Sequence, residues 1–372
     1  MTDINPLLAV VAAFAVKGTP CQVQPLGNGL INDTFLVKTE ENAQPDYVLQ
    51  RINQHVFTDV ALLQRNIEMV TQHLRHKYAA RGVQDVGRRV LRFLYTRDGT
   101  TYHRDDDGNY WRMSVYIPRT QTLETVTPQS ATSAGNAFGQ FEADLVDLPA
   151  QPGETIPNFH NLCYRLQQLH EVVGSDPAGR VRDNADVRKM LDEIHSDSHD
   201  MTLAERMYAE GKLPKRICHC DTKVNNILFD EQGEVLCVVD LDTVMPSYIF
   251  SDYGDFLRSA VNTTAEDDGD MSHVGFRDDI FQAFTTGYLH SASSFLSPVE
   301  VEMLPYAVAL FPYMQAVRFL WDHISGDHYW KCRYSDHNLD RARNQMQLYR
   351  IAKQKHDDMA AFIHKTLKQH TP

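Results

Sequence analysis

Short apolar runs separated by polar turns characterise the first third of the chain. The runs at 35–37, 47–49, 90–95 and 110–117 have the length and the β-branched or aromatic content of strands. Residues 59–76 instead place apolar side chains three and four positions apart, behind an aspartate that can cap a helix. This pattern predicts a small antiparallel sheet accompanied by one helix.

Beyond Pro118 the periodicity becomes that of helices. Six segments carry it: 130–145, 159–170, 186–209, 276–291, 299–321 and 338–368. A strand-like island at 217–242 interrupts them. Because 372 residues exceed the range over which one core keeps growing, we expect an α+β protein with two lobes. The predicted lobes are a β-rich N-terminal lobe, 1–118, and a larger helical C-terminal lobe, 119–372, with a ligand bound at their junction.

The apolar stretch 7–16 has the look of a secretory signal. It lacks basic residues in front, offering only Asp3, and ten residues cannot span a bilayer. Its apolar side chains share one helical face, so we expect an amphipathic helix packed on the first lobe.

The balance of charges restricts the partners of the chain. With 36 basic and 49 acidic residues the net charge is −13, which nucleic-acid backbones and anionic membrane surfaces repel. Neither is an expected partner. Six scattered cysteines are too few for a disulfide framework at this length and include no Cys-x-x-Cys pair for zinc. We therefore expect reduced thiols and a cytoplasmic protein.

The segment 219–242 combines polar side chains with a predicted hairpin. Asp221 and Asn226 stand in the loop before its first strand, and Asp240 ends its second strand. Antiparallel pairing would bring Asn226 and Asp240 together, and two hard oxygen ligands suit Mg²⁺. Asp221, across the loop from the metal, could accept a proton from a hydroxyl directed at a phosphate.

The pattern His-x-Asp-x-Lys-x-x-Asn at 219–226 resembles the catalytic loop of protein-kinase-like enzymes. Asp240 falls where those enzymes carry a metal-binding aspartate. However, Cys220 replaces the usual arginine, Asp-Leu-Asp at 240–242 replaces Asp-Phe-Gly, and no Ala-Pro-Glu segment follows. These departures point away from protein substrates and towards the aminoglycoside phosphotransferase and choline kinase-like family.

Further segments are similar to the N-acetylhexosamine 1-kinases within that family. They are spread over nearly the whole chain, at 27–32, 47–51, 65–68, 252–255, 318–320, 326–329 and 337–339. The resemblance implies a two-lobed kinase fold and an ATP-dependent, Mg²⁺-requiring transferase of carbohydrate metabolism. Its expected acceptor is the C1 hydroxyl of an N-acetylhexosamine such as GlcNAc or GalNAc.

Contacts to the nucleotide are expected from the first lobe. Gly27, Asn28 and Gly29 precede a strand, where missing side chains would let backbone N–H groups approach phosphates. Met113 and Tyr116 bound the segment expected to run under the adenine.

One departure concerns the lysine that the family carries on its third strand, which would fall at Gln50. Arg51 is adjacent but should point to the opposite face of the strand. Either Arg51 or another base replaces this charge, or magnesium and the loop position the phosphates. In the family a glutamate pairs with this lysine and would fall at Glu68, so the role of Glu68 is open. Lys223 has the spacing to meet the γ-phosphate. Asp242 either touches the same magnesium or fixes the loop.

The acceptor side is expected in the helical lobe. The resemblance implies that Arg318 and Tyr329, with Asn32 from the glycine-rich loop, contact the sugar beside Asp221. Core packing with a buried ion pair is the alternative for these residues. The aspartates of 252–255 are expected to brace the catalytic loop.

Two other functions remain open. A kinase of the same fold could phosphorylate an amino alcohol, methylthioribose, homoserine or an aminoglycoside, although Arg318 favours a neutral sugar over cationic acceptors. A nucleotide-binding pseudokinase without turnover is supported only by Gln50. The sequence leaves the oligomeric state undetermined and is compatible with a monomer.

Overall fold

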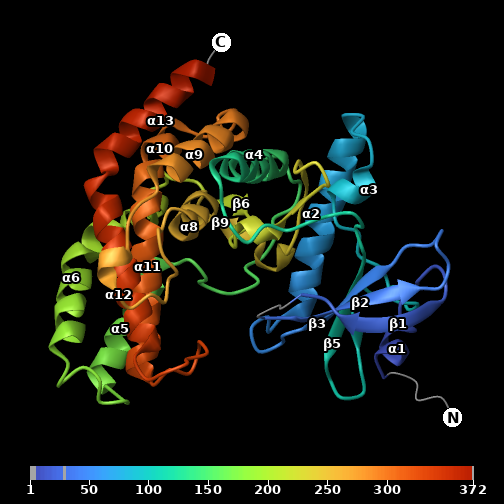
Figure 1. The fold of residues 1–372 in the computed structure, drawn as a ribbon, viewed down its shortest axis with the longest axis horizontal. Helices are drawn as coiled ribbons and strands as arrows, with labels where there is room; N and C mark the ends of the chain where they lie inside the picture. Colours follow the sequence, from blue (N-terminus) through green and yellow to red (C-terminus); the bar gives the residue numbers. More distant parts are fainter. Residues whose placement is uncertain (1–5, 28–30, 371–372) are drawn as a thin grey trace. The chain divides into compact units, whose positions relative to one another are not determined.

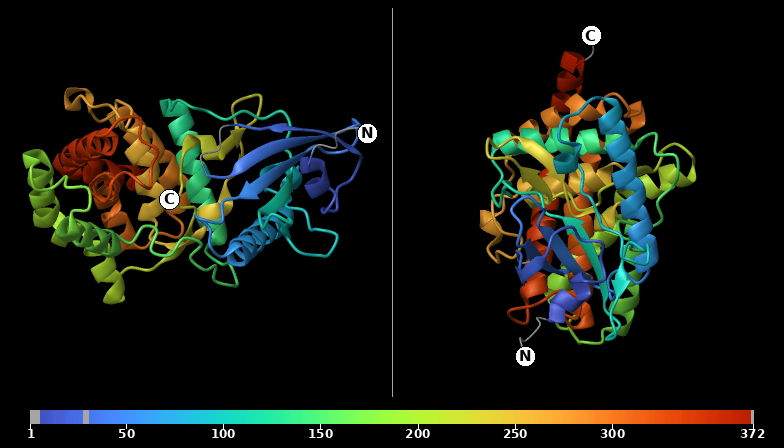
Figure 2. Two further views of the ribbon diagram at one scale, coloured as in Figure 1. Left: turned by 90° about the horizontal axis from the view of Figure 1, so that it is seen from below. Right: turned by 90° about the vertical axis from the view of Figure 1, so that its right-hand side faces the viewer.

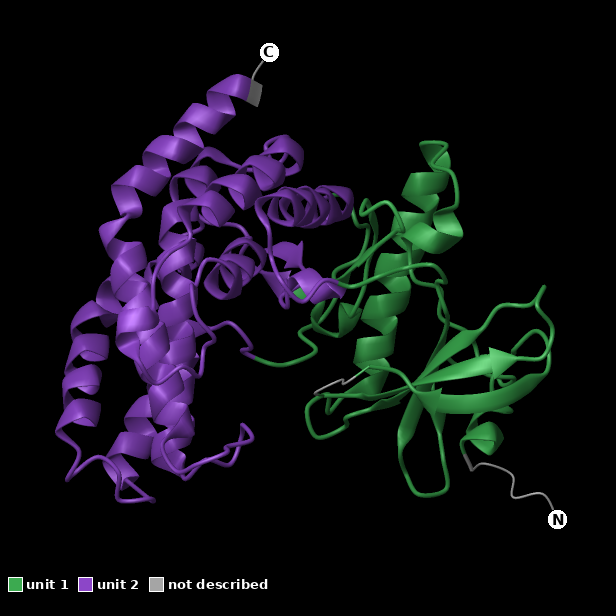
Figure 3. Cartoon of the chain, viewed as in Figure 1, with its two compact units in different colours: residues 1–122, 147–157, 227–245 green, residues 123–146, 158–226, 246–372 purple. Residues whose placement is uncertain are grey.

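The computed structural model describes residues 6–27 and 31–370 (Figure 1). The predicted nucleotide contacts Asn28 and Gly29 therefore lie outside the described residues. The chain divides into two compact units, coloured separately in Figure 3. Unit 1 comprises Met1–Thr122, Asp147–Pro157 and Ile227–Met245, and unit 2 comprises Leu123–Val146, Asn158–Asn226 and Pro246–Pro372. Each unit combines three separate segments of the chain, whereas the predicted lobes, 1–118 and 119–372, are contiguous. The predicted lobe boundaries therefore stay a prediction.

Unit 1 contains a five-stranded antiparallel sheet. Its strands are β1 (Pro20–Pro25), β2 (Asp33–Thr39), β3 (Tyr47–Ile52), β4 (His103–Arg104) and β5 (Tyr110–Val115), in the order β1-β2-β3-β5-β4. Leu49 and Met113 form the middle of its apolar face, which the short helix α1 (Pro6–Val11) and Phe14 cover. Figure 2 shows this sheet from two further sides.

The segment 90–95, predicted as a strand, is not a regular one. It makes only two backbone hydrogen bonds to β5, Leu94 N–H to Met113 O at 2.8 Å and Val115 N–H to Arg92 O at 2.9 Å. Leu94 packs on the sheet, whereas Leu91 packs on a separate cluster with residues of strand β8 (Val235–Val238). The segment therefore bends so that its side chains pack on two separate small cores, which a straight strand would not allow.

Helix α2 (Val60–Ala80) confirms the predicted cap, because Asp59 Oδ1 accepts the Leu62 N–H at 2.8 Å. A one-turn helix, α3 (Val86–Arg89), follows it. Unit 1 also holds a hairpin from far along the chain, β7 (Ile227–Phe229) and β8 (Val235–Val238), followed by the 3₁₀ turn η2 (Leu241–Thr243).

Unit 2 is helical. Its helices are α4 (Pro128–Leu145), α5 (Leu162–Ser175), α6 (Ala185–Met201), α7 (Leu203–Ala209), α8 (Phe250–Ala260), α9 (Asp278–Ala292), α10 (Pro298–Glu302), α11 (Leu304–Ser325), α12 (His337–Gln354) and α13 (His356–His370). Helix α11 is apolar nearly all round and lies buried against α5, α8 and α12. Three predicted long helices are each divided, at Thr202, Met303 and Lys355, whose ψ angles near zero end one helix and begin another.

Helices α4 and α9 approach each other through glycine. A Cβ at Gly135 would lie 2.2 Å from the Phe284 carbonyl oxygen, and one at Gly287 would lie 2.0 Å from the Thr132 carbonyl oxygen. Only glycine permits such a backbone contact. In the described part of the chain no helix is long and apolar enough to cross a membrane. All six cysteines are free thiols.

Candidate active site

Asp252 holds the predicted catalytic loop from behind. Strand β6 (Arg216–Cys218) leads into this loop, and Asp252 stands in the first turn of α8. Its two carboxylate oxygens accept the N–H groups of His219 and Cys220 at 2.8 and 2.7 Å, while Thr222 Oγ1 donates to its carbonyl at 2.7 Å. The expected bracing of the loop by Asp252 is therefore confirmed, and it fixes the backbone directly before Asp221, the predicted catalytic aspartate.

The ring of His219 is a packing element of this loop. It meets the rings of Phe138 and Phe141 edge-on, with centroids 5.6 and 5.8 Å away. Both phenylalanines project from α4, so this helix forms an aromatic wall behind the loop.

A buried acidic cluster adjoins Asp252 that sequence reasoning missed. One ligand-type atom each of Glu142, Cys218 and Asp252 lies within 4.8 Å of the other two. Burial raises the pKa of Asp252 to about 6 and raises the pKa values of Glu142 and Cys218 well above their ordinary values. Glu142 and Cys218 therefore keep their protons at neutral pH, and Tyr288 donates its hydroxyl to Glu142 Oε2 at 2.5 Å. The only sequence signal was a glutamate on the apolar face of a predicted helix.

Asp221, Lys223 and Asn226 converge at the mouth of the loop. Lys223 Nζ lies 2.6 Å from Asp221 Oδ1, and Asn226 Nδ2 donates to the Asp221 carbonyl and to Oδ2 at 2.8 and 3.2 Å. Burial alone would raise the pKa of Asp221, but the Lys223 charge and these bonds outweigh it and lower the pKa. Asp221 is therefore a carboxylate at neutral pH, partly open to solvent and held in one orientation.

A second buried acid, Asp255, connects the loop to the helical core. Burial raises the pKa of Asp255, Arg258 opposes this effect, and the Asp221 charge adds to it. Arg258 bonds to Asp255 at 3.3 Å and to Glu266 at 3.0 Å. Burial opposes the charge of Lys223, yet Asp221 and Asp255 together raise its pKa. Within described unit 2, Asp255 thus acts on the catalytic loop through charge rather than through a hydrogen bond to it.

The two predicted magnesium ligands flank the β7–β8 hairpin rather than lying in its strands. Asn226 closes the 3₁₀ turn η1 (Val224–Asn226) directly before Ile227, whose partner is Val238. Asp240 follows β8 by two residues, is exposed, and has a left-handed backbone with φ of 59°. The hydrogen bonds of Asn226 to Asp221 use its amide nitrogen, so its amide oxygen and the Asp240 carboxylate are hard donors that fit Mg²⁺.

Asp242 belongs to a buried network that the sequence did not predict. Arg112 of β5 forms an ion pair with Asp242 Oδ1, and Asn32 Nδ2 donates to Asp242 Oδ2 at 2.7 Å. Arg112 also donates from Nε to Gln50 Oε1 at 2.9 Å. The amide oxygen of Asn32 accepts the Asn53 N–H at 3.0 Å, so both ends of this predicted sugar contact are engaged inside unit 1.

The remaining predicted nucleotide contacts have ordinary surroundings in unit 1. Gly27 has φ of +70°, in the region that favours glycine. Arg51 is exposed and forms an ion pair with Asp33. Met113 is fully buried in the sheet, with its carbonyl bonded to Leu94, and the backbone N–H of Tyr116 donates to Asp46 at 2.9 Å. The roles of these residues towards ATP stay predictions.

Glu68 does not lie in an ion pair with a basic residue among its described contacts. It accepts hydrogen bonds from Tyr95 Oη and from Gln72 Nε2 on the surface of α2. The resemblance implies that Glu68 pairs with a lysine, but the position of that lysine holds Gln50. Glu68 instead contacts Tyr95 and Gln72.

The predicted sugar residues of unit 2 lie around Arg318. Its guanidinium stacks over Phe159 and Trp330, 5.5 and 5.3 Å from the ring centroids, and donates to Gln315 at 3.0 Å. Tyr329 is 54% exposed. Its backbone is fixed because Asp322 accepts the N–H groups of residues 328, 329 and 330 at 3.0, 2.8 and 3.0 Å.

The surroundings of Arg318 are electropositive. Burial, together with the charge of Arg318, lowers the pKa of Arg165 to about 10. Burial likewise lowers the pKa of His160 well below its ordinary value, with Arg318, Arg165 and Arg258 acting in the same direction. Arg318 thus lies close enough to Arg165 and to Arg258 for charge to act within each pair, which the sequence did not show because these residues are far apart along the chain.

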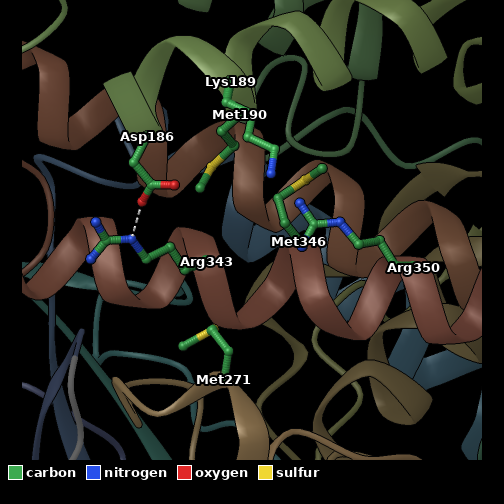
Figure 4. A pocket seen from close by; sticks show the side chains of 7 residues that line it. All are labelled: Asp186, Lys189, Met190, Met271, Arg343, Met346 and Arg350. Carbon is green, nitrogen blue, oxygen red and sulfur yellow. Dashed lines mark hydrogen bonds and ion pairs between the residues drawn. The ribbon is translucent and has the colours of Figure 1, made fainter. Parts of the chain in front are cut away.

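Two cavities of unit 2 are lined mainly by residues of α6 and α12. The first, of about 230 Å³, is lined by Asp186, Lys189, Met190, Met271, Arg343, Met346 and Arg350 (Figure 4). Figure 4 shows the ion pair of Arg343 with Asp186 at its edge, at 2.5 Å. None of the predicted site residues lines this cavity.

Comparison with known proteins gives the family and the fold. The model of the phosphotransferase enzyme family matches residues 22–290. An aminoglycoside phosphotransferase from Alicyclobacillus acidocaldarius has a similar structure (TM-score 0.60, 16% identity, 99% of this chain and 98% of that chain covered). So does the microcompartment-associated aminopropanol kinase (0.62, 17%, 96% and 99%). Amicoumacin kinase hAmiN, solved with AMP-PNP, Ca²⁺ and Ami, is also similar (0.58, 14%, 94% and 93%). The predicted kinase-like fold, with an antiparallel sheet in the N-terminal part and helices in the C-terminal part, is confirmed.

Proposed function

The chain belongs to the phosphotransferase enzyme family, and we propose that it transfers the γ-phosphate of ATP to the C1 hydroxyl of an N-acetylhexosamine. The observation that carries the transfer step is the Asp221 carboxylate, kept ionised by Lys223 and oriented by Asn226. The loop that holds it is fixed by Asp252.

In the proposed reaction the sugar O1 forms a bond to the γ-phosphorus as the bond to the β–γ bridging oxygen breaks. The hydroxyl proton passes to an Asp221 oxygen, and ADP leaves with the electron pair of the broken bond. Since the transition state is loose, Asp221 acts chiefly by orienting the hydroxyl and takes the proton late. Lys223, whose pKa is raised, stays charged and stabilises the transferring phosphoryl oxygens.

Asn226 and Asp240 are the residues that would hold Mg²⁺. When bound with ATP, this ion neutralises the charge that develops between the β- and γ-phosphates. A similar structure, that of amicoumacin kinase, was solved with an ATP analogue and a divalent cation, which supports a metal–nucleotide substrate here.

The positive surroundings of Arg318 favour a neutral sugar as acceptor. Choline, aminopropanol and aminoglycosides carry cationic nitrogen, which Arg318, Arg165 and Arg258 would repel. Phe159 and Trp330, which stack with the Arg318 guanidinium, add aromatic rings of the kind that sugar sites commonly contain. An amino alcohol is the alternative acceptor, since the aminopropanol kinase shares the fold at 17% identity.

An acceptor panel tests the proposal. ADP release is measured with N-acetylglucosamine, N-acetylgalactosamine, choline, aminopropanol, methylthioribose, homoserine and an aminoglycoside, and ³¹P NMR locates the phosphate on the product. We expect turnover with an N-acetylhexosamine and a sugar 1-phosphate.

Asp221→Asn is the matched control in this panel. It should lower turnover about 10²- to 10⁴-fold while ATP binding is retained, because it keeps the shape of the side chain and removes the proton acceptor. Preferred turnover of a cationic acceptor would contradict the sugar assignment, and ATP binding without any turnover would indicate a pseudokinase.

A further inference from the structure

Gln50 stands where the family carries a lysine, and the neighbouring strand supplies a positive charge there, on Arg112. Gln50 of β3 and Arg112 of β5 are directly opposite in the antiparallel register, so their side chains share one face of the sheet. Gln50 makes its bonds with Arg112, at 2.9 Å, and with Thr34, at 3.2 Å. A lysine at position 50 would instead place a second cation against the guanidinium. The glutamine is therefore the neutral partner that Arg112 requires.

Burial of Arg112 is costly unless its donors are satisfied. Its side chain is only 2% exposed, and its guanidinium packs on the ring of Phe93 at 5.5 Å from the centroid. Asp242 supplies the countercharge and is itself only 4% exposed. A buried ion pair contributes little net stability compared with apolar residues of similar size. Its effect here is to fix geometry, and the geometry concerned is that of the chain around Asp242.

Asp242 anchors the turn that carries Asp240. The left-handed φ of 59° at Asp240 is unfavourable for a residue with a Cβ and persists only where neighbouring contacts hold it. Asp242, two residues on, supplies those contacts: its carboxylate binds Arg112 and Asn32, and its carbonyl accepts the Thr155 hydroxyl at 2.8 Å. With both carboxylate oxygens engaged, Asp242 braces the turn, and Asp240 is the exposed residue of the two.

We propose that Arg112 is a positioning residue for phosphoryl transfer, which through Asp242 holds Asp240 in the backbone conformation that binds the metal–nucleotide. This inference rests on the proposed function. It assigns to Arg112 the positive charge that the family's lysine would have placed at position 50. It also assigns Asp242 to support rather than to metal coordination. Arg112 acts through Asp242 and does not itself touch the substrate.

The test measures the binding of Mn²⁺ together with ADP, with the free ion quantified by its electron paramagnetic resonance signal. Mn²⁺ is the probe because it accepts the same oxygen donors as Mg²⁺. Arg112→Met should weaken this binding by about 10- to 100-fold, the usual effect of removing a group that orients a metal ligand. The KM for MgATP should rise by a similar factor. Arg112→Lys restores a cation beside Asp242 and should recover part of the affinity.

Arg104→Met is the matched control, since Arg104 is an exposed arginine on β4 of the same sheet, lies over the Tyr110 ring at 5.4 Å from its centroid, and should leave binding unchanged. Circular dichroism checks that each variant is folded. If Arg112→Met does not fold, Arg112→Gln replaces it, and the proposal then requires Arg112→Gln to bind more weakly than Arg112→Lys.

Wild-type affinity in every folded Arg112 variant would overturn the proposal, as would an equal loss in Arg104→Met. Binding of Mn²⁺ with ADP needs no acceptor. A chain that phosphorylates nothing in the acceptor panel would therefore contradict the proposed function, while this measurement still decides the role of Arg112.

Discussion

Two buried aspartates support the predicted site, and each unit holds its own with different chemistry. In unit 2, Asp252 is held by the backbone N–H groups of His219 and Cys220. In unit 1, Asp242 is held by the side chains of Arg112 and Asn32. Burial raises the pKa of Asp252 to about 6, whereas Asp242 is held by a direct ion pair with Arg112. The first support should respond to pH, and the second to substitution of its partner.

The largest effect on the free energy of unfolding is expected for Asp242→Asn. This change leaves the Arg112 guanidinium buried without its countercharge, which costs about 3–5 kcal/mol. Urea unfolding measures it. The double variant Arg112→Met with Asp242→Asn should be less destabilised than the sum of the two single variants, because the uncompensated charge is gone. Additive losses would show that the two residues do not act as a pair.

The second prediction concerns the pH dependence that Asp252 imposes. Its pKa rises from 3.8 to about 6 on folding, so between these values the native state binds a proton that the unfolded chain has released. The contribution of this group to stability is therefore greatest below pH 4 and is lost as the pH rises through 6, by about 3 kcal/mol at most.

Thermal unfolding of the wild type and Asp252→Asn from pH 4 to 8 measures this term, because the variant lacks the titrating group. The difference in stability between the two proteins should change across pH 4–6 and level off above pH 7. A difference that is constant with pH would mean that Asp252 titrates alike in both states.

A smaller effect is expected at Glu142, which lies beside Asp252. Burial keeps this carboxyl protonated at neutral pH, so Glu142→Gln preserves both its charge state and its acceptor for the Tyr288 hydroxyl. We expect a loss below about 1 kcal/mol in urea unfolding at pH 7. Glu142→Leu is the contrasting variant, since it leaves that hydroxyl buried without an acceptor and should cost more. Equal losses in both variants would contradict a neutral Glu142.

The smallest effect on stability is expected for Lys223→Met. The side chain of Lys223 is 45% exposed, and ion pairs open to solvent contribute about 0–1 kcal/mol. Turnover should nevertheless fall about 100-fold, because a cation facing the transferring phosphoryl group is removed. Steady-state kinetics beside urea unfolding separate the two quantities. Unchanged turnover would return Lys223 to the status of a surface lysine.

The catalytic loop was predictable because its signal is local. Asp221, Lys223 and Asn226 lie within six residues, so spacing alone brings their side chains together. The cap at Asp59 and the main helices were predictable for the same reason, since periodicity is a property of neighbouring positions.

The supports behind the site were not predictable, because their partners are distant in sequence. Arg112 and Asp242 are 130 positions apart, and Glu142 and Tyr288 are 146 apart. Which residue meets which then depends on how strands and helices pack, and a single chain carries no local trace of it. Arg112 was hidden further because an arginine within a strand normally indicates an exposed face.

The close approach of α4 and α9 has a consequence for how this protein can vary. One added methyl group at Gly135 or Gly287 would force the two helices apart. Because Phe138 and Phe141 belong to α4, that displacement would move their rings away from the ring of His219, which packs against both. Two glycines without any chemistry of their own should therefore tolerate replacement as poorly as Asp221, the proposed proton acceptor.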